Sequence, residues 1–242
     1  IFAYGTSTGG SYLSVSNLVS NSGVVAADTT GVGTGRYNLG AAKYGVGLAI
    51  MAFGHDGSSV ANYKNLINSS GVVASDASST GHARSRISAV GYGTDKAIFF
   101  GGHSATYSSG TTISNLCSNT GVVASDTANS SGVTARYELA GTSYGVGLAI
   151  FAYGSTDSNV SMSNKVSISG VIAADVTGVG SARQQMGATN YGDDKGIFAY
   201  GWLGSDTAVS NLVSNTGVVA ADVSGVGTAR HGLSAAGFSA SA

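Results

Sequence analysis

The segment SNLVSNSGVVAADTTGVGTGR at residues 16–36 returns almost unchanged as SNLVSNTGVVAADVSGVGTAR at residues 210–230. Three further versions lie between these two, so the pattern occurs five times with a period of 47 to 52 residues. Repeats of this length, built from short apolar runs separated by Gly and Ser, are typical of repeated small sheets and not of helical solenoids. The sequence therefore predicts an all-β protein made of five similar units.

Each repeat carries the same two charged residues, an Asp after the Gly-Val-Val segment and an Arg after the loop that follows. They are Asp28, Asp76, Asp126, Asp175 and Asp222, and Arg36, Arg84, Arg136, Arg183 and Arg230. Buried charges persist mainly where they are paired and hydrogen-bonded, so we interpret these ten residues as structural. An Asn that also recurs in every repeat, at position 65 for example, is interpreted in the same way.

Each unit contains four segments that are predicted to be strands, for example residues 36–45, 48–54, 63–69 and 71–76. The first is made of small residues, which suit a crowded axis. The second is apolar at nearly every position, as expected for a strand covered on both faces. Asn-Ser-Gly and Asn-Thr-Gly between the third and fourth segments supply the positive φ that a tight hairpin turn needs.

Four-stranded sheets repeated around an axis predict a five-bladed β-propeller of antiparallel blades that fills residues 1–242 as one domain. The chain begins with a segment that resembles the second strand of a unit, and it ends with a segment that resembles the first strand. The C-terminal inner strand is therefore expected to pair with the N-terminal strand and close the ring. The expected blades are residues 230–242 with 1–34, then 35–82, 83–134, 135–181 and 182–229.

One order of elements runs through the whole chain: an Arg, a strand of small residues, Tyr-Gly, an apolar strand ending in Gly, a hairpin and the next Arg. This order resembles the kelch repeat, and most closely the kelch-like repeats of marine phage and environmental sequences. The kelch Gly-Gly doublet occurs once, at residues 101–102, and the kelch outer-strand Trp is absent. The resemblance implies a propeller that serves as a structural or receptor-binding module of a phage virion or tail.

Function is expected where the repeats differ, in the loops between the second and third strands, because loops on a rigid scaffold often carry binding residues. In the predicted blades these loops lie on one face together with the loops that lead to the next Arg. The candidate ligand-binding residues on this face are Tyr12, His55, Asp56, Tyr63, His103, Tyr107, Asp157, Trp202 and Asp206, and His82 lies on the same face. Aromatic rings beside Asp, Asn and Ser suit a sugar, whereas scattered exposed aromatics on an ordinary surface are the alternative.

The leading hypothesis is a non-enzymatic structural or receptor-binding module with a protein or glycan partner at the variable face. A virion or extracellular location is favoured, within a larger virion or multidomain protein. The alternatives are a lectin-like carbohydrate-binding protein and an enzyme with its site at the channel mouth. The chain contains one Glu, Glu138, and shows no unmatched pair of carboxylates of the kind used in glycoside hydrolysis.

Composition argues against several other partners. The formal net charge of −1 and the 10% of charged residues predict no nucleic-acid partner. No apolar run approaches the roughly 18 residues of a membrane span. The four His show no metal-ligand spacing, so neither a metal nor a cofactor is expected. Cys117 aligns with Val and Ile in the other repeats and is expected to be a buried hydrophobe.

Overall fold

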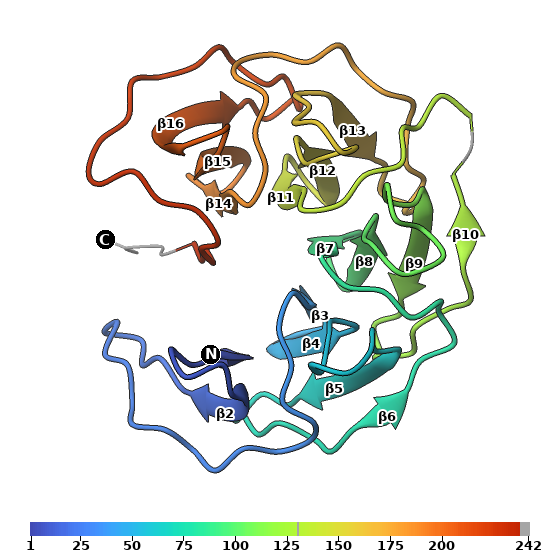
Figure 1. Ribbon diagram of the computed structural model, residues 1–242, viewed down its shortest axis with the longest axis vertical. Coiled ribbons are helices and arrows are strands. Elements are labelled where there is room, and N and C mark those ends of the chain that lie inside the picture. The colour runs from blue at the N-terminus through green and yellow to red at the C-terminus, as the bar shows by residue number, and fades with distance from the viewer. Residues whose placement is uncertain (130, 238–242) are drawn as a thin grey trace.

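The computed structural model describes residues 1–129 and 131–237, which form five small antiparallel sheets arranged along an open arc (Figure 1). The first sheet contains β1 (Phe2–Thr6) and β2 (Tyr12–Asn17). The second contains β3 (Gly40–Tyr44), β4 (Leu48–Ala52), β5 (Tyr63–Ile67) and β6 (Ala77–Ser78). The third contains β7 (Ser88–Tyr92), β8 (Lys96–Phe100), β9 (Ile113–Cys117) and β10 (Thr127–Ala128).

The last two sheets have three strands each. The fourth contains β11 (Ala140–Tyr144), β12 (Leu148–Ala152) and β13 (Ser163–Val166), and the fifth contains β14 (Gly187–Tyr191), β15 (Lys195–Trp202) and β16 (Asp206–Val213). No helix occurs among the described residues. The predicted all-β fold with several sheets is confirmed.

The inner strands β3, β7, β11 and β14 lie next to one another along the inside of the arc. Their small residues allow this close approach. A Cβ atom placed on Gly40 of β3 would lie 3.0 Å from Phe99 and 3.1 Å from Ala89 of the neighbouring sheet. Because backbone and aromatic side chain meet there directly, a larger residue would separate the two sheets.

The hydrophobic core lies between consecutive sheets and not within one of them. Phe53 and Phe99 join the second sheet to the third, with ring centroids 5.3 Å apart. Phe100 and Phe151 join the third to the fourth, at 5.2 Å. Tyr153 joins the fourth to the fifth through Phe198, at 5.5 Å. Each sheet therefore depends on its neighbours for burial of its apolar faces, as is typical of repeat proteins.

The predicted closed five-bladed propeller is wrong. The sheets have two, four, four, three and three strands, and no closed sheet forms. Within the described residues β1 pairs only with β2, and residues 231–237 form no strand.

The path of the C-terminal segment explains the open arc. Gly232 N–H donates to Gln185 O at 2.9 Å, and Ala235 packs beside Gly187. The segment therefore follows β14 and does not join β1, and Figure 1 shows the two on opposite sides of the opening. The rest of the predicted last strand, residues 238–242, lies outside the described residues.

The predicted fourth strand is also wrong in its extent. Val73 makes a single bridge with Ile67, and a fourth strand of two residues exists only in the second and third sheets among the described residues. The reason lies in a side chain, because Asn65 Nδ2 donates to Ala74 O at 2.9 Å and to Asp76 Oδ1 at 2.9 Å. Asn65 thus occupies Ala74 O, while the backbone bonds from Asn68 N–H to Val72 O and from Ala74 N–H to Leu66 O remain.

Candidate ligand-binding site

The repeated Arg, Asn and Asp form one network in each of the middle sheets. Arg84 is fully buried and donates from Nε to Gly101 O at 2.8 Å, from Nη1 to His82 O at 3.0 Å, and from Nη2 to Asn115 Oδ1 at 2.6 Å. Asn115 Nδ2 then donates to Asp126 Oδ1 at 2.8 Å. Each of the three guanidinium nitrogens has a protein partner, which supports the structural interpretation of these residues.

Arg84, Arg136 and the carboxylates of Asp76 and Asp175 are charged at neutral pH. Burial lowers the pKa of Arg84 and of Arg136 to about 10, still well above neutrality. Partial burial alone would raise the pKa of Asp76, but hydrogen bonds from Asn65 and Thr34 outweigh it and bring that pKa below its ordinary value. The same balance lowers the pKa of Asp175 and Asp222.

A second set of repeated positions, two residues after each Arg, forms an arc at the axis. All five residues have a positive φ: Asn38 at 53°, Arg86 at 54°, Glu138 at 54°, Gln185 at 56° and Gly232 at 65°. Each N–H of the last four donates to the carbonyl of the preceding member, at 2.8, 2.9, 3.1 and 2.9 Å. We call this set the axial arc. These hydrogen bonds join consecutive sheets through the backbone and do not depend on the side chains, which differ from repeat to repeat.

The axial arc borders a central cavity of about 800 Å³. Within it Arg86 Nε lies 3.4 Å from Glu138 Oε1. Sequence reasoning missed these residues as site candidates. A signal for them exists in the sequence, because the residue two positions after each constant Arg differs between repeats. The prediction considered such differences only in the loops between the second and third strands.

A smaller cleft of about 420 Å³ opens beside the axial arc between the fourth and fifth sheets. Its aromatic and polar lining includes Tyr137, Asp157, Asn159, Gln184, Gln185 and Trp202. The Oε1 atom of Gln184 is buried and has no hydrogen-bond partner among the described residues. A buried acceptor without a partner is uncommon, and here it belongs to a residue that lines the cleft.

Neighbouring groups hold the two aromatic rings of the cleft. Tyr137 meets His103 edge-on, with centroids 5.5 Å apart and an interplanar angle of 71°. Trp202 meets His231 edge-on at 5.1 Å and 65°. Burial is the main cause that lowers the pKa of His103, with Arg86 adding to it, so this imidazole is neutral at neutral pH.

Hydrogen bonds fix the polar side of the same cleft. Asp157 adopts a φ of 75° and accepts from Ser109 Oγ at 2.6 Å and from Tyr137 Oη at 3.5 Å. Asn159 Nδ2 donates to Trp202 O at 3.2 Å. Hence of the nine residues predicted for ligand binding, Asp157 and Trp202 line the cleft and His103 supports one of its rings.

The other predicted residues belong to separate groups. Tyr12 stacks on Tyr37 at 5.4 Å and 14°, and Tyr37 in turn contacts His55 at 5.5 Å. Tyr63 Oη donates to Asp56 Oδ2 at 3.4 Å. The predicted continuous surface is thus divided into local clusters.

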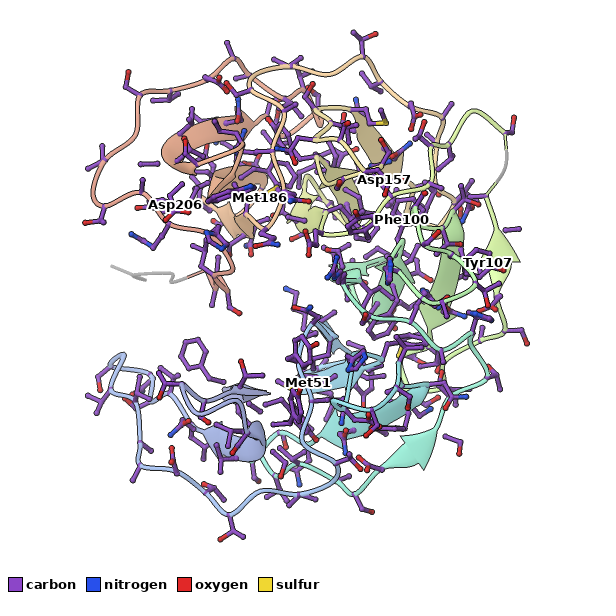
Figure 2. The ribbon with its side chains drawn as sticks, viewed as in Figure 1. Met51, Phe100, Tyr107, Asp157, Met186 and Asp206 are labelled. Atoms are coloured by element: carbon purple, nitrogen blue, oxygen red, sulfur yellow. The ribbon has the colours of Figure 1, made fainter. Side chains whose placement is uncertain are left out.

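Tyr107 and Asp206 are the two remaining candidates, and their contacts are with other residues. Tyr107 meets His82 edge-on at 5.0 Å, and Figure 2 shows Tyr107 at the outer rim, away from Asp157 and Asp206. Asp206 Oδ1 lies 2.5 Å from Nδ1 of His231, the imidazole that contacts Trp202. Asp206 therefore reaches the cleft through one intermediate residue, whereas Tyr107 does not contribute to it.

Other chemistry finds little support in the described part of the chain. No group of three His, Cys, Asp or Glu is placed there to hold a metal ion. Cys117 is fully buried, and burial raises the pKa of its thiol to about 11, which keeps it protonated. None of the described residues forms a helix long and apolar enough to cross a membrane.

No protein-family model matches this chain, and no curated protein matches it. The resemblance to kelch-like repeats and to phage sequences stays a prediction.

Proposed function

We propose that the protein is a non-enzymatic binding module that holds a small saccharide in the cleft between Tyr137 and Trp202. One observation carries this proposal: a cleft whose polar lining brings the amides of Asn159 and Gln185 and the carboxylate of Asp157 beside Tyr137 and Trp202. The cleft volume of about 420 Å³ lies in the range of small-molecule sites.

The chemistry of the lining matches a sugar. A saccharide carries hydroxyl groups that both donate and accept, together with C–H faces that can lie against aromatic rings. The carboxylate of Asp157 can accept hydrogen bonds from such hydroxyl groups. The amides of Asn159 and Gln185 offer further donors and acceptors beside the rings.

The carboxylates of the cleft favour binding over hydrolysis. Glu138 is paired with Arg86, and Asp157 accepts hydrogen bonds from Ser109 and Tyr137. A glycosidase needs one carboxyl group kept protonated as an acid and a second one free to act on the sugar or on water. Both carboxylates here are held by protein partners, which supports a role in orienting a ligand.

Replacing Trp202 or Tyr137 with Ala is expected to weaken glycan binding by at least about tenfold, because aromatic anchors in pockets carry a large share of binding energy. The assay is a glycan array followed by titration of the best ligand. Tyr107→Ala is the matched control, since this aromatic residue lies on the outer rim, and it should bind as the unchanged protein does.

Two results would contradict the proposal. One is an array on which the unchanged protein binds no glycan. The other is binding that survives Trp202→Ala and Tyr137→Ala but is lost in Tyr107→Ala, which would place the site on the outer rim. A glycan on a cell surface would make the same cleft a receptor-binding site, so the lectin-like and receptor-binding hypotheses share this test.

A further inference from the structure

The two ends of the arc carry complementary halves of the repeated network. At the first sheet, Asn17 Nδ2 donates to Asp28 Oδ1 at 2.7 Å, but no Arg joins this pair among the described residues. At the other end, Arg230 is exposed, and the one hydrogen bond that its side chain makes with the described residues is to Thr228 O at 3.0 Å. Arg36, Arg84, Arg136 and Arg183 are all fully buried.

The middle repeats show how the two halves fit. In the second sheet Arg36 Nη2 contacts Asn65 Oδ1 at 2.5 Å, and Asp76 accepts from both N and Oγ1 of Thr34, at 2.9 and 2.7 Å. Thr228 and Arg230 have the same spacing as Thr34 and Arg36. The segment that contains them therefore matches the vacant position beside Asn17 and Asp28.

Two other features are unpaired in the same way. Phe2 is 47% exposed, whereas Phe99, Phe151 and Phe198, at the same position in the later repeats, are fully buried against the preceding sheet. In the axial arc, Asn38 N–H and Gly232 O have no partner among the described residues. Within the described part of the chain, one end of the arc thus has an Asn17–Asp28 pair without an Arg, an exposed Phe2 and an unbonded Asn38 N–H. The other end of the arc has an exposed Arg230 and, among the described residues, a Gly232 O without a partner.

We infer that copies of this chain associate head to tail through these two ends. Residues 228–237 of one copy lie along β1 of the next as an added strand, which is an established mode of recognition at a free sheet edge. Arg230 then enters the Asn17–Asp28 pair of the second copy, and Phe2 of that copy packs against the fifth sheet of the first. The contact is heterologous, so it either closes a ring of copies or extends.

Charge reversal tests this pairing. Arg230→Asp and Asp28→Arg should each weaken self-association by about 30-fold or more, because each places like charges in a desolvated contact. Sedimentation velocity over a wide range of protein concentration measures the effect. Lys195→Asp, which changes an exposed Lys beside Asp194, is the matched control and should associate as the unchanged protein does.

Mixing the two single variants restores a complementary contact between different copies and should restore association. An unchanged protein that remains monomeric at all concentrations would overturn the inference, and so would variants that associate undiminished. Single variants that lose association but fail to regain it on mixing would overturn the pairing of Arg230 with Asp28.

Discussion

Replacing Arg84 with Met is expected to lower the free energy of unfolding by about 3–5 kcal/mol, the range for removing one partner of a buried ionic network. Three acceptors would lose their donor, namely the carbonyl oxygens of Gly101 and His82 and Oδ1 of Asn115. Asn115 also holds Asp126, so the loss would spread to the carboxylate. Urea denaturation followed by circular dichroism measures the change.

Arg230→Met is the matched control for this variant. Arg230 holds the same place in its repeat but is exposed. Among the described residues its side chain makes one hydrogen bond and a contact over the Tyr200 ring at 3.8 Å. We expect a loss of about 1 kcal/mol or less at a protein concentration where the chain is monomeric. Equal losses in Arg84→Met and Arg230→Met would contradict the view that burial in the network gives the repeated Arg its role.

Replacing Phe99 with Ala is expected to cost about 3–5 kcal/mol, since a buried aromatic side chain loses both its transfer free energy and its packing. Phe99 is fully buried, packs on Gly40 and contacts Phe53 at 5.3 Å between centroids. The cavity would therefore open between two sheets and reduce the contact that joins them. Thermal and urea unfolding monitored together measure the loss.

The matched control for Phe99→Ala is Val46→Ala, because Val46 is 94% exposed. This change should leave stability within about 0.5 kcal/mol of the unchanged protein. If Phe99→Ala were as mild as Val46→Ala, the core could not lie between the sheets as described.

The features that sequence predicted correctly are local ones. The repeat itself showed that five similar units exist, and apolar runs such as residues 48–53 became central strands. The turn before Val72 formed as expected, with Asn68 N–H donating to Val72 O and Gly71 at a φ of 77°. Local alternation and turn chemistry suffice for such features.

The errors concern interactions between side chains and distant backbone. Residues 71–76 have the composition of a strand, but they form one bridge, between Val73 and Ile67, and the side chain of Asn65 occupies Ala74 O. The expected closure required residues 230–242 to pair with β1, but the described part of that segment lies along β14. Local sequence patterns do not determine which distant backbone groups a segment or a side chain will bond.

Part of the candidate site was predictable for the same reason. Asp157 and Trp202 differ between repeats in obvious loops and were identified, whereas Gln184 and Gln185 lie directly after a constant Arg and were not. Gln185 has the positive φ of the axial arc, which the sequence does not show because only one of the five members of this arc is Gly. Comparing repeats position by position would have found them.

The cleft beside Trp202 is the proposed ligand-binding site. Because Trp202 is the single Trp of the chain, its fluorescence reports directly on binding there. Titration of the unchanged protein with the best glycan from the array, followed by tryptophan fluorescence, should give a saturable change in Trp202 emission. Tyr137→Ala removes the second aromatic ring of the lining and should shift that curve to about tenfold higher ligand concentration or more. Binding that saturates on the array while Trp202 emission stays constant would contradict the claim.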